Sequence, residues 1–332
     1  MLKISVDIET RGGHLACFSL ALNHLEAICI PIMCVENQEG YWSLEEELMI
    51  VLKVRQLLLH PNVGVIGQNY HYDAQHFCRY MQINSKVVLD TMTMQGLCWP
   101  GEPKGLDYIS SLYCEHHQYW KDEGKEWDLR FPEEEYWGYN CKDACRTYEA
   151  AMVLEDLVGK LGLQPQLDEL QGMYTPLLVT MLRGVRMDMK ARAKMAGELM
   201  EYMTACEQWF ETLLGHTLNP RSPKQMKALF FDDLGQRVRK RSKTTGQPSL
   251  DNDVLEDIAA KEPLLLPLCK GIANYRSAGV FLKTFVLAKL DHDKRLRTMY
   301  GIVGTETFRL NSSADAFGLG TNLQNIPAAT GE

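Results

Sequence analysis

The strongest constraint on the fold is a change in the hydrophobic pattern near residue 160. Before it, short β-rich runs at residues 2–8, 14–22 and 26–35 are followed by helical and strand-like segments in alternation. After it, apolar residues recur with the 3.6-residue period of helices that bury one face. The chain has 332 residues, which is more than one typical core uses. We therefore predict two or three domains, with an α/β layer domain first and a mainly helical part after it.

The individual elements follow from the same patterns. The three N-terminal runs predict an antiparallel meander, because only short turn-like segments separate them. In the first part we also expect strands at 62–67 and 87–89 and helices at 44–59, 69–81, 105–113 and 132–157. In the second part we expect helices at 164–182, 190–214, 222–234 and 251–290.

The composition is typical of a soluble globular protein, with 45% hydrophobic and 23% charged residues. No apolar run approaches the roughly 18 residues that a membrane helix needs, so we expect no membrane partner. The first ten residues, MLKISVDIET, include two acids and do not have the character of a signal peptide. The ten cysteines form no C-x-x-C pair, and we expect thiols in a reducing compartment.

Charge is distributed unevenly along the chain. The net charge of −8, taken alone, argues against nucleic-acid binding. Residues 1–150, however, hold 12 basic and 22 acidic residues, whereas residues 151–332 hold 23 basic and 21 acidic ones. Residues 219–246 hold eight basic residues and two acidic ones. The average therefore conceals an acidic first part and a locally basic second part.

The first candidate site is Asp7-Ile8-Glu9 on the first expected strand. Residues i and i+2 of a strand point to the same face, so the two carboxylates lie side by side. In an otherwise apolar strand they repel each other strongly unless a cation lies between them. A frayed strand end with two solvated acids is the alternative interpretation.

Two further patterns place polar groups at helical spacing. Asn69 and Asp73 are four residues apart at the start of the helix expected after the buried strand. Tyr139 and Asp143 are four residues apart on the helix expected at 132–157. Residues at i and i+4 project from one face of a helix, so each pair is expected to act together.

In this order, D-x-E, N-x-x-x-D and Y-x-x-x-D resemble the three motifs of proofreading 3′–5′ exonucleases, which carry four acids and a tyrosine on a ribonuclease-H-like fold. The resemblance implies such an exonuclease domain, a mixed sheet flanked by helices, at residues 1–157. It implies that Asp7 bridges two divalent cations (Mg²⁺ or Mn²⁺), that Glu9 and Asp143 complete one metal site and that Asp73 serves the other. Tyr139 would orient the attacking water, because a tyrosine with a pKa near 10 is a poor base at neutral pH.

The chemistry of phosphodiester hydrolysis explains these residue types. The reaction needs an activated water and a stabilised leaving oxygen, and two divalent ions about 4 Å apart supply both. Mg²⁺ prefers oxygen ligands and takes a few carboxylates together with phosphate oxygens. Close to the second motif, we expect Asn69 to help place the substrate strand. Tyr70, Tyr72 and Phe77 are expected to stack on unpaired bases, with core packing as the alternative for at least one of them.

The second part carries a separate resemblance. Residues 305–313 (TETFRLNSS) and 321–327 (TNLQNIP) are similar to the segment of family A DNA polymerases that runs from T-x-T-G-R-x-S-S to N-L-Q-N-I-P. Phe308 stands where most of that family has glycine, and Asn311 where it has serine. Three segments resemble the phage branch of the family: residues 104–106 (KGL), 119–125 (YWKDEGK) and 314–320 (ADAFGLG). Three others resemble its palm and thumb: residues 177–188, 219–235 and 243–255.

This second resemblance implies a domain order. Residues 158–189 would begin the palm, 190–290 would form a helical thumb, and 291–332 would be an incomplete palm segment with a primer–template contact motif. The palm aspartates and the fingers helix of the family lie beyond the NLQNIP motif and are not in this sequence. We therefore expect no polymerisation by this chain alone.

Contacts with duplex DNA are expected in two sets. Amide and guanidinium groups suit the minor groove, because its acceptors are shared by all base pairs. The resemblance assigns this role to Arg309, Asn322, Gln324 and Asn325. Basic side chains would contact phosphates, with a solvated loop as the alternative for the basic run: Lys224, Lys227, Arg237, Arg239, Lys240, Arg241 and Lys243, together with Arg276 and Lys283.

The leading prediction is the N-terminal part of a phage-type family A DNA polymerase. It would remove 3′-terminal nucleotides from single-stranded or frayed DNA and would grip a primer–template duplex. The resemblance implies the cytoplasm of a phage-infected bacterial cell, where a second chain could complete the polymerase. The alternatives are a non-catalytic DNA-binding half of a split polymerase and an exoribonuclease with the same acids.

Overall fold

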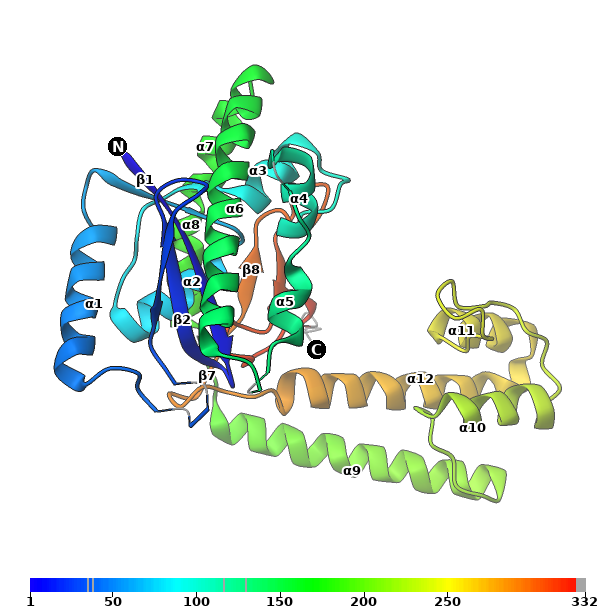
Figure 1. Cartoon of the computed structure of the whole chain (residues 1–332). Helices are drawn as coiled ribbons and strands as arrows, with labels where there is room; N and C mark the ends of the chain where they lie inside the picture. The colour runs from blue at the N-terminus through cyan, green and yellow to red at the C-terminus, as the bar shows by residue number, and fades with distance from the viewer. Residues whose placement is uncertain (35, 38, 116, 129, 327–332) are drawn as a thin grey trace. The chain divides into compact units, whose positions relative to one another are not determined.

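The computed structural model describes residues 1–34, 36–37, 39–115, 117–128 and 130–326, and the chain divides into two compact units. Unit 1 consists of Met1–Val185 together with Leu290–Glu332, and unit 2 of Arg186–Lys289 (Figure 1). The expected α/β layer fold is confirmed in unit 1, and the expected helical part is found in unit 2. The names palm and thumb remain predictions.

A five-stranded mixed sheet forms the centre of unit 1, in the order β3-β2-β1-β4-β5. β1 (Leu2–Arg11) pairs antiparallel with β2 (His14–Ala21), which pairs antiparallel with β3 (Ala27–Pro31), so the expected meander is confirmed. β4 (Val63–Gly67) runs parallel to β1, and β5 (Val87–Asp90) runs parallel to β4. The β1–β2 register shifts directly after the second acid of the D-x-E motif, as it does at a β-bulge.

Helices cover both faces of this sheet (Figure 1). The apolar side chains Ile4, Val6 and Ile8 of β1 point to one face and share a core with three helices: α1 (Leu44–Leu58), α2 (His71–His76) and α8 (Tyr174–Arg183). Because side chains alternate along a strand, Asp7 and Glu9 point to the opposite face. The helices on that face are α3 (Thr91–Cys98), α6 (Glu133–Lys160) and α7 (Gln164–Gly172).

Local sequence explains where the main helices of unit 1 begin. Ser43 and Glu46 form a reciprocal capping box at the start of α1, in which each side chain accepts a backbone hydrogen bond from the other residue. α6 starts after Pro132 with three consecutive glutamates, whose negative charge suits the positive end of the helix dipole. α6 then runs for 28 residues and contacts every strand of the sheet. Its length lets one helix pack across the whole sheet face to which Asp7 and Glu9 point.

Two helices expected from the sequence are interrupted by proline. The helix expected at 164–182 is divided into α7 and α8 at Met173, because Pro176 cannot donate a hydrogen bond to the preceding turn. The helix expected at 251–290 is interrupted at Glu262, which precedes Pro263 and has non-helical backbone angles, since proline disfavours the helical conformation in the residue before it. The segments on either side of this interruption are α11 (Asn252–Lys261), a 3₁₀ turn (Pro263–Leu265), α12 (Leu266–Phe281) and a π-helical end (Leu282–Val286).

The helix expected at 69–81 begins later than the sequence suggests. Asn69 lies outside it with a left-handed φ of 55°, and α2 begins at His71. The expectation that Asn69 and Asp73 share a helical face is therefore wrong, since only Asp73 lies on the helix. Two short helices, α3 and α5 (Lys121–Glu126), were not expected from the sequence. The other short elements of unit 1 are a π-helical turn (Phe77–Met81), α4 (Leu106–Tyr113), β7 (Arg295–Leu296), β8 (Met299–Gly301), β9 (Asn311–Ser313) and a 3₁₀ turn (Leu323–Asn325).

Unit 2 is a helical unit with its own core. Phe210, Phe230, Ile258 and Ile272 are completely buried in it. Besides α11 and α12, it contains α9 (Met189–Leu214), α10 (Pro223–Lys227) and a π-helical turn (Ala228–Asp233), and the short strand β6 (Val185–Arg186) lies on the boundary between the two units. Asp188 caps the start of α9, and Ser222 caps α10 with proline at its first position, as the sequence predicts.

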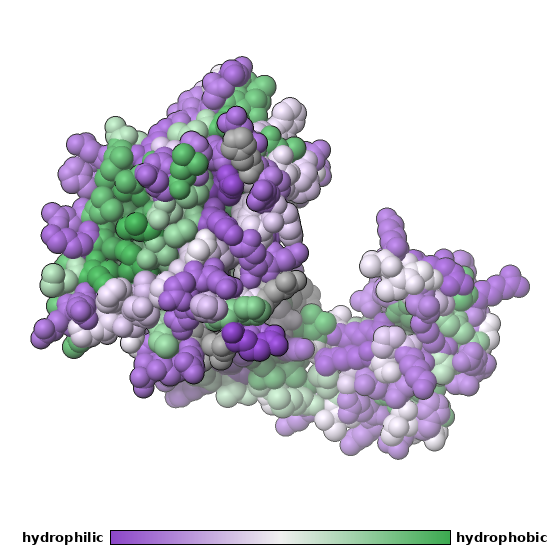
Figure 2. Space-filling view, viewed as in Figure 1, coloured by the Kyte–Doolittle hydropathy of each residue, from purple (hydrophilic) through white to green (hydrophobic). Residues whose placement is uncertain are grey.

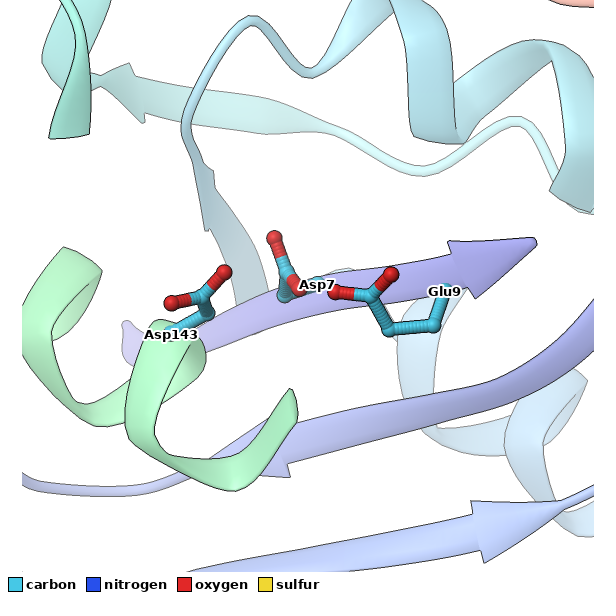
Figure 3. Close-up of side chains that lie close together, drawn as sticks. All are labelled: Asp7, Glu9 and Asp143. Atoms are coloured by element: carbon cyan, nitrogen blue, oxygen red, sulfur yellow. The ribbon is translucent and has the colours of Figure 1, made fainter. Parts of the chain in front are cut away.

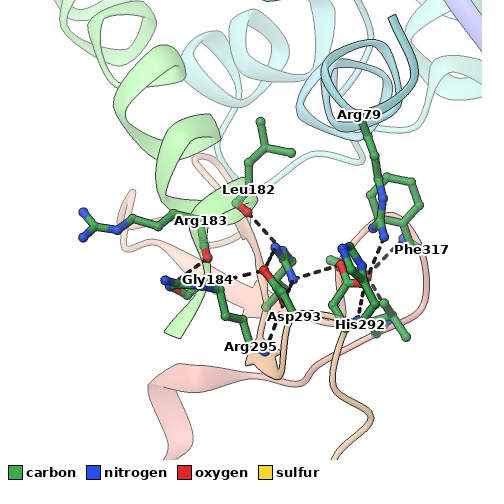
Figure 4. Close-up of polar contacts among 12 residues, drawn as sticks. Arg79, Leu182, Arg183, Gly184, His292, Asp293, Arg295 and Phe317 are labelled. Atoms are coloured by element: carbon green, nitrogen blue, oxygen red, sulfur yellow. Dashed lines mark hydrogen bonds and ion pairs between the residues drawn. The ribbon is translucent and has the colours of Figure 1, made fainter. Parts of the chain in front are cut away.

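After unit 2 the chain returns to unit 1, where buried charges hold it (Figure 4). The carboxylate of Asp291, only 5% exposed, pairs with Arg79 and Arg297 at 2.9 Å each. Arg297 also donates to the carbonyl oxygen of Leu182, and the Arg79 guanidinium lies 4.3 Å from the centre of the Phe317 ring. These contacts join the returning segment to the π-helical turn at Phe77–Met81 and to α8.

The surface of unit 1 includes a hydrophobic area around α1 and the N-terminal strands (Figure 2). Exposed large apolar side chains in this part of the chain include Leu25, Ile28, Leu44, Leu48 and Leu52. Within the described residues, no helix has both the length and the apolar character that crossing a membrane requires.

Candidate metal centre

Three carboxylates from two elements meet on the α6 side of the sheet (Figure 3). Asp7 and Glu9 come from β1, and Asp143 comes from α6. One oxygen atom from each of them lies within 4.8 Å of the others, a spacing at which a single ion could be held. The predicted convergence of the first and third motifs is therefore observed.

The chain fixes each of these carboxylates with a neutral hydrogen-bond donor. The Asn140 side-chain nitrogen donates to Asp7 at 2.7 Å, and the Tyr136 hydroxyl donates to Glu9 at 3.0 Å. The sequence interpretation missed both donors. Their spacing carried the signal, because positions 136, 140 and 143 are three or four residues apart and lie along one stripe of a helix.

The third carboxylate, that of Asp143, has two partners, and both come from the start of α5. The indole nitrogen of Trp120 donates to one carboxylate oxygen of Asp143 at 2.5 Å. The ammonium group of Lys121 lies 2.5 Å from the other oxygen. Among the described residues, Lys121 is thus the basic side chain that is ion-paired with this acid cluster.

Asp73, the fourth acid of the predicted set, is buried beside β1. Its carboxylate accepts a hydrogen bond of 3.0 Å from the backbone N–H of Ile8. It lies outside the group of three that shares the 4.8 Å spacing, although its charge contributes to raising the pKa of Asp7. Its role as a second metal ligand stays a prediction.

The three clustered acids are difficult to ionise together. Burial and the charges of Asp143, Asp73 and Glu9 raise the pKa of Asp7 well above its ordinary value. Burial and the charge of Asp143 raise the pKa of Glu9 to about 7. Burial also raises the pKa of Asp143, although Lys121 partly opposes this. Buried, repelling oxygen donors of this kind fit a hard divalent cation, which would relieve both penalties.

Tyr139 lies next to the cluster, as the third motif predicts. Its side chain is mostly buried, and its hydroxyl oxygen lies 3.4 Å from the Lys121 nitrogen. Burial and the charges of Asp143, Glu9 and Asp7 raise its pKa above the ordinary value. The hydroxyl therefore stays protonated at neutral pH and can donate or accept a hydrogen bond, which suits positioning.

The predicted single-strand contacts are only partly compatible with the structure. Tyr70 is 1% exposed and its hydroxyl bonds to Ser85, and Phe77 is fully buried against Phe18. The prediction that these two rings stack on bases is therefore wrong, because their apolar faces complete the core. Tyr72 is half-buried and bonds to Thr10 at the end of β1, so one aromatic side chain of the set remains near the surface.

Several basic residues of unit 2 that were expected to contact DNA are used inside the unit. Arg239 pairs with Asp257 at 2.6 Å, and Lys240 pairs with Asp251 at 2.7 Å. Arg276 donates to the carbonyl oxygens of Pro220 and Leu250. Lys227 and Arg241 also form internal hydrogen bonds, whereas the exposed members of the predicted set include Lys224, Arg237, Lys243 and Lys283.

The predicted minor-groove residues lie on the returning segment of unit 1. Arg309, Gln324 and Asn325 are exposed, and the Asn322 side chain accepts a hydrogen bond from Ser312 at 2.6 Å. Phe308 has a φ of 56°, a left-handed conformation that favours glycine. The unusual residue at this position thus keeps the backbone conformation of a glycine site, and its ring packs against the unit 1 core.

Comparison with known proteins agrees with this geometry. Residues 1–158 match the family model described as 3′–5′ exonuclease, and residues 189–332 match the model described as DNA polymerase family A. The chain is thus similar over most of its length to family A DNA polymerases that carry a 3′–5′ exonuclease domain. The acid cluster lies entirely within the residues that match the exonuclease model.

The chain is also similar to individual bacterial proteins. It is 33% identical to DNA polymerase I of Pseudomonas aeruginosa over 99% of its own length and 36% of the relative. It is 29% identical to DNA polymerase I of Rhizobium leguminosarum over 84% of its own length and 28% of the relative. The chain thus spans about a third of these curated relatives.

A solved structure gives the same fold. The polymerase domain of Pol1 from M. smegmatis, in complex with a DNA primer-template and dNTP, superposes on 98% of the chain with a TM-score of 0.68. The chain covers 52% of that protein, and the sequence identity is 19%. At this identity the likeness concerns the fold alone.

Proposed function

We propose that the chain is a divalent-cation-dependent 3′–5′ exonuclease that removes nucleotides from the 3′ end of single-stranded or frayed DNA. The observation that carries the proposal is the meeting of the partly buried Asp7 and Glu9 with the buried Asp143, with the hydroxyl of Tyr139 beside them. The family and the burial of these acids both favour a hydrolytic site over a solvated acidic surface.

In this proposal, Asp7, Glu9 and Asp143 hold the cations, with Asp73 as a further ligand. When bound, the cations supply an activated water and stabilise the charge on the leaving 3′-oxygen. Asn140 and Tyr136 orient the ligands through their hydrogen bonds to Asp7 and Glu9. The protonated hydroxyl of Tyr139 holds the water in line with the phosphate, which is a positioning role and needs no proton transfer.

The test is the shortening of a 5′-labelled single strand by the purified chain with Mg²⁺ or Mn²⁺. We expect stepwise loss of 3′ nucleotides, and we expect a chain with both Asp7→Ala and Glu9→Ala to leave the strand intact. An RNA strand of the same sequence separates a deoxyribonuclease from an exoribonuclease. A wild-type chain that is inactive with both ions would instead support the non-catalytic DNA-binding role.

We also propose that the second part binds duplex DNA without sequence preference. The relevant cations are the exposed ones, since Arg239, Lys240 and Arg276 already have internal partners. Reversing Lys224 and Lys243 together should reduce the slope of log affinity against log salt by about 2. Lys53→Glu on α1 is the control, and an unchanged slope in the double variant would assign these lysines to the solvent.

The remaining assignments rest on the sequence resemblance. We propose a phage-type enzyme that acts in the cytoplasm of an infected bacterium and that a second chain can complete. Gel filtration of the chain mixed with a polypeptide carrying the rest of the polymerase tests this assembly. Elution as two separate species would contradict it.

A further inference from the structure

The sequence YWKDEGK at 119–125 has no assigned chemistry in the proposed nuclease. In the structure it places Trp120 and Lys121 against Asp143, and each takes a different oxygen of that carboxylate, both at 2.5 Å. The Lys121 side chain is 20% exposed, so its ammonium group lies at the boundary between the acid cluster and the solvent. The motif therefore brings a positive charge to the edge of the acidic pocket.

Lys121 and a divalent cation need the same ligand. Asp143 offers one oxygen to the group of three carboxylates, and the ammonium group lies on that same carboxylate. Two positive charges a few ångströms apart repel each other, strongly so where burial limits solvent screening. A cation bound by Asp7, Glu9 and Asp143 therefore weakens the pairing between Lys121 and Asp143.

A displaced Lys121 has a partner within reach. Its nitrogen is 3.4 Å from the Tyr139 hydroxyl and 5.4 Å from the centre of the ring of Tyr139, the residue proposed to position the attacking water. The phosphodiester of a substrate brings negative charge to the same place. A four-carbon stem with a rotatable ammonium group suits a change of partner, because it requires no backbone movement.

We propose that Lys121 is an exchangeable counter-ion of this site, which pairs with Asp143 when no divalent cation is bound and with a phosphate oxygen of the 3′-terminal nucleotide when one is. The proposal rests on the nuclease function proposed above. It assigns two opposite effects to one side chain, since Lys121 opposes cation binding and favours substrate binding.

The test combines cation binding with turnover in Lys121→Met, which keeps the apolar stem and removes the charge. Mn²⁺ binding to the whole chain is measured by titration calorimetry at pH 8.5, where proton competition for the carboxylates is small. We expect Mn²⁺ to bind about five- to twentyfold tighter than in the wild type. At saturating Mn²⁺, kcat/KM on a single strand should fall by at least about tenfold.

Two variants control for charge and for local structure. Lys121→Arg keeps the charge and should stay within about twofold of the wild type in Mn²⁺ affinity. Lys142→Met removes the neighbouring lysine that pairs with Glu123 across α6 and α5, and because its charge is directed to Glu123 it should change neither quantity. Circular dichroism shows whether each variant folds, and Lys121→Gln replaces Lys121→Met if the latter does not.

The outcomes separate this proposal from the nuclease proposal. An active wild type whose Lys121→Met variant binds Mn²⁺ no more tightly would overturn the exchange alone. Tighter Mn²⁺ binding with unchanged kcat/KM would reject the phosphate contact. A wild-type chain that is inactive with both Mg²⁺ and Mn²⁺ would contradict the proposed nuclease function itself.

Discussion

The two units treat charge in opposite ways. Unit 1 brings the partly buried Asp7 and Glu9 together with the buried Asp143, and burial raises the pKa of all three carboxyl groups. Unit 2 contains many basic residues in its sequence, but pairs such as Arg239–Asp257 and Lys240–Asp251 neutralise part of them. A count of charged residues along the sequence therefore underestimates how strongly the acids of unit 1 repel one another and overestimates how many cations of unit 2 are free to bind DNA. The count does not show which charges are paired inside the protein.

The largest effect that tests this contrast is expected for Asp7→Asn. Exonuclease activity should fall by about 10³-fold or more, because a cation ligand is lost. The free energy of unfolding without divalent cations should instead rise by about 1–3 kcal/mol, because one buried, repelling charge is gone. Urea denaturation and nuclease assays measure the two quantities, and a parallel loss of both would mean that Asp7 is structural.

The next largest effect is a dependence of stability on pH. The pKa of Glu9 is raised to about 7 in the folded chain, so the folded state holds its proton where the unfolded state has lost it. The free energy of unfolding should therefore fall as pH rises from about 4.5 to about 7, by up to about 3 kcal/mol for this group, and Asp7 acts in the same direction.

Urea titrations at several pH values, with a chelator, measure this dependence. Glu9→Gln should flatten the curve, and the surface change Glu26→Gln should not. Adding Mg²⁺ at pH 7 should recover the lost stability, because an ion that binds only the folded state stabilises it. A wild-type curve that is flat between these pH values would show that the acids are solvated.

The basic residues of unit 2 give a third, smaller effect. Arg276→Met should lower the free energy of unfolding by about 2 kcal/mol, since it leaves the carbonyl oxygens of Pro220 and Leu250 without their charged donor. The exposed Lys283→Met should change it by less than about 0.5 kcal/mol. Chemical denaturation of both variants measures the difference, and equal losses would contradict the distinction between internal and exposed cations.

The smallest effect concerns how α5 positions Tyr139. A Cβ atom on Gly124 would lie 2.6 Å from two carbon atoms of the Tyr139 ring, so Gly124→Ala must move the ring. We expect a loss of about tenfold in kcat with unchanged Mn²⁺ affinity, since positioning alone is disturbed. Gly138→Ala, with no neighbour within 4 Å of the new atom, is the matched control, and equal activities of the two variants would exclude a role for this contact.

Part of the site could be predicted from local sequence alone. Asp7 and Glu9 share a face because strand side chains alternate, and Tyr139 and Asp143 share one because a helix turns every 3.6 residues. The periodicity also predicted most helices correctly. It failed where proline interrupts a continuous apolar pattern, as at Pro176 and Pro263. The spacing of hydrophobic residues does not show where proline leaves a helix without a backbone N–H donor.

Other parts depend on contacts between distant segments. The sequence did not reveal that Tyr70 and Phe77 complete the core, because an aromatic side chain suits both a core and a base-stacking surface. The sequence also did not reveal that Asn140 donates to Asp7 and that Lys121 pairs with Asp143, because each contact joins two different elements that only the fold brings together.

By itself, the amino-acid sequence determined that Asp7 and Glu9 share one face of a strand and that Tyr139 and Asp143 share one face of a helix, because those properties are set by residues a few positions apart. Only the tertiary structure decided which charges are buried together, which have a partner and which face the solvent. The physical reason is that burial and pairing are properties of packed surfaces, and β1 meets α6, which in turn meets α5, although both helices lie more than 100 positions further along the chain.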